Sequence, residues 1–149
     1  RGVDINGAAI EVGRAWFAQE GIQNIHLSLG RADDLSQFPD GAFDVVFTHA
    51  VLLYIGPDKI QKAVLDMLRV ARKALILSEW HEPAAGDRDR CGLGRLHRDH
   101  WKRDYVALLR QFVHEDQIEV TRPPAAIWPE DAPAWRELGT IVEVRKTAQ

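Results

Sequence analysis

Residues 30–55 read GRADDLSQFPDGAFDVVFTHAVLLYI, and this stretch decides the fold that we expect. Its polar first half ends in a strong turn signal, Pro39-Asp40-Gly41. A compact apolar run from Phe43 to Phe47 follows, and such a run is typical of a strand that is buried on both faces. Buried strands of this kind occur in sheets covered by helices. The stretch therefore predicts an α/β protein with a largely parallel sheet.

Short strands and helices alternate upstream of this stretch. Gly2–Ile5 has the pattern of the end of a buried strand, and Asn6 is a candidate helix cap. Apolar residues recur at helical spacing over Ala8–Glu20, and Ile25–Leu29 alternates like a strand. A parallel crossover usually carries a helix, so residues 31–37 are expected to supply a short one.

The alternation continues downstream. We expect a helix that begins near Pro57, a buried strand at Ala74–Leu77 and a further helix from Tyr105 to Phe112. Ile118–Val120 and Ile141–Val144 are predicted to be two closing strands. Together these elements indicate a layered α/β sheet within one domain.

Composition narrows the class of protein. The chain has 149 residues, of which 46% are hydrophobic and 28% charged, as expected for one globular domain. A net charge of -3 gives no electrostatic support for nucleic-acid binding. Cys91 is the only cysteine, so an internal disulfide and a cysteine-based zinc site are excluded. No stretch is predicted to span a membrane, and a cytoplasmic location is the expectation.

In open α/β sheets, ligands bind outside the carboxyl ends of the strands. Four polar segments are predicted to lie at such ends: Asp4-Ile5, Arg31–Asp33, Thr48–Ala50 and Glu79–Glu82. A carboxylate at the position of Asp4 could accept hydrogen bonds from both hydroxyls of a ribose. It could equally help to cap the helix that follows, and the sequence leaves both roles open.

Three segments together resemble a known family. GVDIN at residues 2–6, the stretch at 30–55 and LRVARKALILSEW at residues 68–80 resemble the class I S-adenosylmethionine-dependent methyltransferases of the small-molecule type. The central segment resembles the signature GDAxxLPFPDxSFD of this type. The resemblance implies a Rossmann-like open sheet with helices on both faces, mostly parallel with an antiparallel last strand. It also implies that residues 1–149 form a partial methyltransferase domain that starts at the family's second strand.

The resemblance also implies the cofactor, S-adenosyl-L-methionine, and the residues that bind it. The implied set is Asp4, Ile5, Ala32, Asp33, Thr48 and His49. In it, Asp4 would bind the ribose, Ile5 would form an apolar wall for adenine, and the backbone N–H of Ala32 would face the adenine edge. Thr48 and His49 would line the methionine part.

At the expected adenine site, the sequence departs from the family pattern. Arg31 stands where the family usually has an aspartate, and a guanidinium cannot accept a hydrogen bond from the adenine amino group. Asp33 is the residue that could take over this contact. If neither does, the domain could be a methyltransferase-like binding module without catalysis, which is one alternative to an enzyme.

In methyl transfer, the protein positions the reactants, excludes water and, for some acceptors, supplies a base. The candidates for a base are His49, Glu79, His81 and Glu82, of which His81 is preferred and His49 is the second choice. Tyr54 or Trp80 could face the sulfonium cation. Packing or surface exposure is the competing explanation for each residue. The acceptor is expected to be a small molecule, with neither nucleic acid nor membrane as partner.

The segment from His81 to Asp99 is charged and contains glycines, so we expect a mobile lid there. His97, Asp99 and His100 match no metal-ligand motif, and no metal site is predicted. Three tryptophans are expected to pack under the final helix and hairpin: Trp101, Trp128 and Trp135.

A nicotinamide-dependent oxidoreductase is the other enzyme class considered, since Asp4 could bind the ribose of NAD. The direction of the last strand separates the two classes, because the methyltransferase family implies an antiparallel one and a dehydrogenase sheet stays parallel.

The glycine-rich cofactor loop of the family has no counterpart before Asp4, and Gly92-Leu93-Gly94 lies far downstream. In the family this loop follows a first strand that lies between the second and fourth strands. We therefore expect the chain to be N-terminally truncated, with a βα unit of at least about 30 residues upstream of Arg1, and inactive without it. A strand from a second copy, in a homodimer, could also fill the gap. Direct pairing of the second strand with the fourth would contradict the strand assignment.

Overall fold

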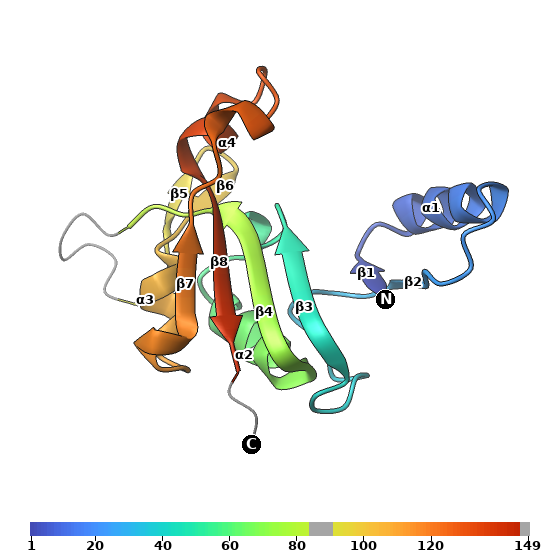
Figure 1. Cartoon of the computed structure of the whole chain (residues 1–149), viewed down its shortest axis with the longest axis horizontal. Coiled ribbons are helices and arrows are strands. Elements are labelled where there is room, and N and C mark those ends of the chain that lie inside the picture. Colours follow the sequence, from blue (N-terminus) through green and yellow to red (C-terminus); the bar gives the residue numbers. More distant parts are fainter. Residues whose placement is uncertain (84–90, 147–149) are drawn as a thin grey trace.

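The computed structural model describes residues 1–83 and 91–146. Its main sheet has the order β3-β4-β8-β7 (Figure 1), formed by β3 (Phe43–His49), β4 (Ala71–Trp80), β8 (Gly139–Arg145) and β7 (Ile118–Thr121). β3 and β4 run parallel, whereas β8 is antiparallel to both β4 and β7. The expectation of an α/β fold whose last strand is antiparallel is confirmed.

A second, two-stranded sheet lies to one side of the first. β1 (Gly2–Asp4) pairs in parallel with β2 (Leu27–Leu29), and α1 (Gly7–Gln19) connects them (Figure 1). Asn6 caps α1 as expected, because its side-chain oxygen accepts hydrogen bonds from the backbone N–H groups of Ala8 and Ala9 at 3.1 and 3.2 Å.

The two sheets face each other across a cavity of about 430 Å³, which is lined by residues of both β1 and β3. Among the described residues, β1 pairs only with β2 and β3 only with β4. β3 also carries exposed apolar side chains, with Phe47 at 73% and Val45 at 48% exposure. The β1–β3 pairing that would contradict the strand assignment is therefore not formed. A strand between β1 and β3 stays a prediction.

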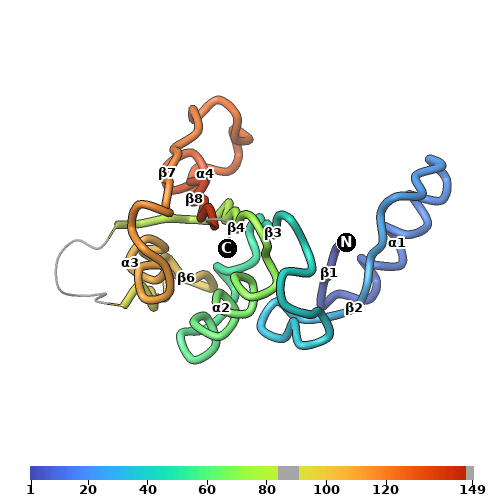
Figure 2. The backbone as a smooth tube through the Cα atoms, turned by 60° about the horizontal axis from the view of Figure 1, so that its bottom comes forward, coloured from blue at the N-terminus to red at the C-terminus, as the bar shows by residue number. Residues whose placement is uncertain are grey.

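The core lies between the main sheet and two helices. α2 (Ile60–Val70) and α3 (Tyr105–Leu109) lie on the same side of this sheet in Figure 2. Apolar residues of α2 at helical spacing meet those of β4, β8 and α3 in one cluster, which includes Ile60, Val64, Met67, Leu75, Leu77, Leu108 and Val144. In the described part of the chain, no helix is long and apolar enough to cross a membrane.

Several local expectations were wrong. Residues 31–37 form turns, with an isolated bridge between Arg31 and Asp34, and no helix. Asp34 stabilises these turns because its Oδ1 accepts hydrogen bonds from both the backbone N–H and the hydroxyl of Ser36, at 3.2 and 2.7 Å. The short helix α4 (Pro133–Leu138) precedes β8 and was not predicted.

The expected lid is only partly described, because residues 84–90 lie outside the described part of the chain. Further on, β5 (Arg95–His97) and β6 (His100–Lys102) form an antiparallel hairpin where a loop was expected. Gly92 lies so close to α3 that a Cβ there would come within 2.4 Å of the backbone nitrogen of Leu108. This close packing counts against a loosely held lid at Gly92.

Candidate functional site

Three of the residues predicted to bind the cofactor line one cavity. Ala32, Thr48 and His49 lie in the wall of the cavity between β1 and β3, with Thr48 and His49 at the carboxyl end of β3. The hydroxyl oxygen of Thr48 is buried and lies beside the Glu79 carboxyl.

Asp4 is the last residue of β1 and Ile5 follows it, and both lie outside the described lining of this cavity. Oδ1 of Asp4 accepts a hydrogen bond from the backbone N–H of Asn6 at 2.7 Å, in the turn that leads into α1. The structure thus shows the turn-stabilising role for one carboxylate oxygen. Ile5 is 71% exposed, which leaves its side chain free to contact a ligand.

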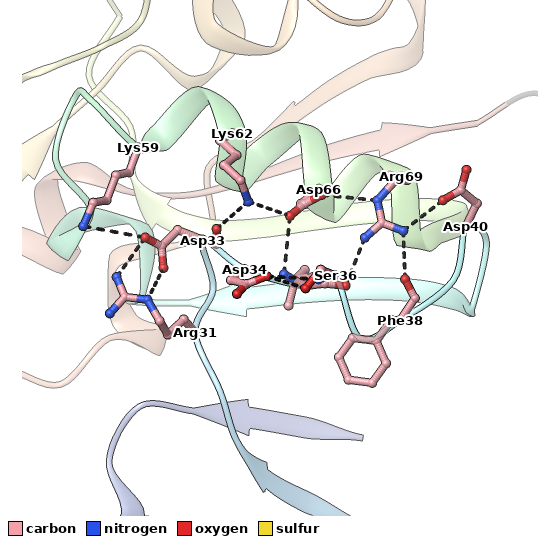
Figure 3. Close-up of polar contacts among 11 residues, drawn as sticks. Arg31, Asp33, Asp34, Ser36, Phe38, Asp40, Lys59, Lys62, Asp66 and Arg69 are labelled. Carbon is pink, nitrogen blue, oxygen red and sulfur yellow. Dashed lines mark hydrogen bonds and ion pairs between the residues drawn. The ribbon is translucent and has the colours of Figure 1, made fainter.

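Asp33 is engaged in an ion-pair network (Figure 3). Nε and one terminal nitrogen of Arg31 donate to its two carboxylate oxygens at 2.8 and 2.9 Å, and Lys59 lies 3.8 Å away. The hydrogen bond from Arg31 holds the pKa of the Asp33 carboxyl below its ordinary value. The carboxylate that was expected to replace the family's aspartate therefore already has a bidentate partner.

The turn after β3 has an unusual backbone. Ala50 adopts a left-handed conformation with φ of 55°, which is uncommon for a residue other than glycine. Its N–H donates to the carbonyl oxygen of Ser78 at 3.1 Å. Nδ1 of His49 lies 3.0 Å from the hydroxyl oxygen of Ser78. β4 thus fixes the segment that is predicted to line the methionine part of the cofactor.

Aromatic side chains gather beside this turn. The ring of His49 lies 5.0 Å from that of Trp135 and 6.3 Å from that of Trp128, and the latter pair is stacked at 8°. Trp80, at the end of β4, lies 6.1 Å from Trp135 and 5.1 Å from His100. We call His49, Trp80, His100, Trp128 and Trp135 the aromatic cluster. Trp128 and Trp135 pack there, and this location was not predicted.

The aromatic cluster also contains unpaired polar atoms. Nε1 of Trp80 and Nε1 of Trp128 are buried and have no hydrogen-bond partner in the described part of the chain. Indole N–H groups usually find an acceptor when they are buried. The cluster thus combines flat apolar surfaces with two buried hydrogen-bond donors.

The four candidate bases differ in their surroundings. Glu79 is fully buried, and burial raises the pKa of its carboxyl. His81 is also buried, which lowers the pKa of its imidazole, and its Nδ1 accepts a hydrogen bond from the backbone N–H of Tyr105 at 3.1 Å. Arg95 forms two hydrogen bonds with Glu82 and lowers the pKa of its carboxyl. His49 is the exposed member of the four.

Catalytic roles for His81 and His49 stay predictions. At the start of α3, the contact of His81 satisfies a backbone donor, which is a structural task. His97 and His100 face each other across the β5–β6 hairpin. No group of three or more His, Cys, Asp or Glu side chains among residues 1–83 and 91–146 could hold a metal ion.

Residues 1–74 match the family model described as a methyltransferase domain. No curated protein matches the chain. Among solved structures, a SAM-dependent methyltransferase from Methanosarcina mazei is 16% identical, with 99% of this chain and 82% of that chain covered and a TM-score of 0.63.

Two further structures are similar over nearly the whole chain. The [4+2]-cyclase SpnF is 18% identical, with 99% of this chain and 66% of that chain covered and a TM-score of 0.63. Geranyl diphosphate C-methyltransferase from Streptomyces coelicolor A3(2), in complex with Mg²⁺, geranyl diphosphate and S-adenosyl-L-homocysteine, is 10% identical. The alignment covers 98% of this chain and 62% of the geranyl diphosphate C-methyltransferase, with a TM-score of 0.66. Residues 1–74 thus match a methyltransferase domain, and the fold of the chain is similar to that of solved S-adenosylmethionine-dependent methyltransferases.

Proposed function

We propose that the protein transfers the methyl group of S-adenosyl-L-methionine to a small-molecule acceptor that binds against the aromatic cluster. The observation that carries this proposal is the position of His49, which belongs both to the cavity lining at the end of β3 and to the aromatic cluster. One residue thus joins the predicted cofactor-binding segment to an apolar surface suited to a flat organic acceptor.

In this proposal the cofactor lies across the carboxyl ends of β1, β2 and β3. The remaining carboxylate oxygen of Asp4 would accept from the ribose, Ile5 would cover the adenine, and the backbone N–H of Ala32 would face the adenine edge. Thr48 and His49 would contact the methionine part. When bound, the cofactor supplies an activated methyl on a sulfonium.

The protein's own contribution is to hold the acceptor in line and to keep water away. Trp80 and Trp135 supply the apolar surface, and the indole N–H groups of Trp80 and Trp128 would orient an acceptor oxygen. His49 is the side chain best placed to accept a proton from the acceptor, because it is exposed and Ser78 orients its ring. His81 stays the other proposed base.

A dehydrogenase fits the sheet less well, because β8 is antiparallel to β4. A non-catalytic binding module is the second candidate, and the Arg31–Asp33 ion pair favours it, since it occupies the carboxylate expected near the adenine. The similar fold of a cyclase also shows that this architecture is found with reactions other than methyl transfer. The cytoplasmic location and a homodimer also stay proposals.

The test is the transfer of tritium from methyl-labelled S-adenosylmethionine to a panel of phenolic and other aromatic small molecules by the intact protein. His49→Ala is expected to reduce the rate at least tenfold. His26→Ala, at an exposed histidine beside β2, is the matched control and should keep the wild-type rate. Cofactor binding without transfer to any acceptor class would favour the binding module.

A further inference from the structure

The turn at residues 50–55 begins at the end of the predicted cofactor-binding segment and contains a 3₁₀ helix, Leu52–Tyr54. Ala50 starts it in a left-handed conformation, and such strain persists only where the surrounding structure enforces it. Tyr54 is 65% exposed, and its ring lies 5.0 Å from that of His100 in the aromatic cluster. The turn thus links the predicted cofactor contacts with the aromatic cluster.

A buried carboxylate holds the start of this turn. Glu79 is fully buried at the end of β4, and its Oε1 accepts hydrogen bonds from the backbone N–H groups of Val51 and Leu52 at 3.0 and 3.2 Å. Its other oxygen, Oε2, is also buried, and the hydroxyl of Thr48 lies beside this carboxyl group. These contacts satisfy backbone donors that the 3₁₀ helix leaves free.

A buried guanidinium holds the far end of the same turn. Arg103, which follows β6, is 1% exposed. Its terminal nitrogens donate to the carbonyl oxygens of Leu52, at 2.7 Å, and of Ile55. Its Nε donates to the carbonyl oxygen of Leu93 at 2.9 Å. A buried carboxyl group and a buried guanidinium from distant parts of the chain therefore hold N–H and carbonyl groups of the same turn.

We propose that Glu79 and Arg103 are positioning residues, which fix the turn at residues 50–55 so that His49 and Tyr54 face the cofactor and the acceptor. The inference rests on the proposed function. Stability alone accounts poorly for the arrangement, because buried charges are costly and apolar residues of similar volume are often as stable. The arrangement is better explained if the site needs one defined geometry of the turn at residues 50–55.

The test compares two variants of the intact protein. Glu79→Met keeps the approximate volume of the side chain and removes its hydrogen-bond acceptor. Glu79→Gln keeps an oxygen that can accept hydrogen bonds from the N–H groups of Val51 and Leu52. Glu119→Gln, at an exposed carboxylate on β7, is the charge-matched control. Two quantities are measured well below the unfolding temperature: amide hydrogen exchange at Val51 and Leu52, and the Kd of S-adenosyl-L-homocysteine by calorimetry.

In Glu79→Met, we expect these two amides to exchange at least tenfold faster than in the wild type, with exchange in β3 unchanged, and the Kd to rise at least tenfold. Glu79→Gln should restore both values to within about threefold, and Glu119→Gln should change neither. Should Glu79→Met fail to fold, Glu79→Asp replaces it, because its shorter side chain withdraws the carboxylate.

If Glu79→Met shows the amide exchange rates and the Kd of the wild type, the inference is overturned. Equal losses in Glu79→Gln and Glu79→Met would also overturn it, because the charge and not the accepted hydrogen bonds would then be decisive. If the wild type itself binds no cofactor, the proposed function fails. The exchange rates of the free protein still test the inference in that case.

Discussion

Arg69, on α2, binds the segment that contains Ala32. The effect of replacing Arg69 by alanine on the free energy of unfolding can therefore be predicted. Its guanidinium donates to the carbonyl oxygens of Phe38 and Leu35 at 2.8 and 3.0 Å, and it forms ion pairs with Asp66 and Asp40 (Figure 3). Hydrogen bonds from charged groups contribute about 1.5–3 kcal/mol each. Because the side chain is 29% exposed, the lower value applies to the two carbonyl contacts. We therefore expect Arg69→Ala to lower the free energy of unfolding by about 3 kcal/mol.

Arg72→Ala is the matched control. Arg72 is 63% exposed and pairs with Asp44 on the surface, and such ion pairs contribute about 0–1 kcal/mol. Both variants are compared with the wild type by urea unfolding at pH 7, followed by tryptophan fluorescence. A loss in Arg69→Ala no larger than that in Arg72→Ala would refute the view that the carbonyl contacts hold this segment.

Three further predictions concern single residues of the site. Asp4→Ala should weaken the binding of S-adenosylmethionine by on the order of 2–3 kcal/mol, measured by calorimetry, through loss of a charge-assisted pair of hydrogen bonds; unchanged affinity would remove Asp4 from the site. Arg31→Ala frees the Asp33 carboxylate and should tighten cofactor binding severalfold, whereas weaker binding would show that Arg31 itself contacts the ligand. The pKa of His81 is lowered by burial from an ordinary value of 6.5, so the unfolded chain takes up its proton first as the pH falls. Stability should then decrease below pH 6.5 until the lower pKa of the folded state is reached. The decrease should be smaller in His81→Gln, measured by urea unfolding between pH 7 and 5, and identical curves would contradict this pKa shift.

The elements of the sheet could be predicted because their signals are local. The apolar run at Phe43–Phe47 became β3, and the helical spacing after Asn6 became α1. The β5–β6 hairpin could not be recognised, because its strands have three residues each and carry charged side chains. The absence of a helix at residues 31–37 follows from side-chain contacts such as those of Asp34 with Ser36, which compete with helical hydrogen bonds.

The site could be predicted only in part, for a related reason. The resemblance implied Ala32, Thr48 and His49, and these three residues line one cavity, whereas their contacts with the cofactor stay predictions. The aromatic cluster joins residues from four separate parts of the chain. Their spacing in the sequence therefore does not predict that they come together. The Arg31–Asp33 ion pair was also missed, although the two residues are close in the chain, because competing partners for an arginine cannot be ranked without geometry.

The central claim is that the carboxyl ends of β1, β2 and β3 bind S-adenosylmethionine, and calorimetric titration of the intact protein tests it most directly. The prediction is saturable binding of one cofactor per chain. Binding should be weaker in Thr48→Val, because valine lacks the hydroxyl group that Thr48 contributes to the cavity wall. NAD, titrated in the same way, should give no binding heat. Binding of NAD in place of S-adenosylmethionine, or no binding of either, would contradict the claim.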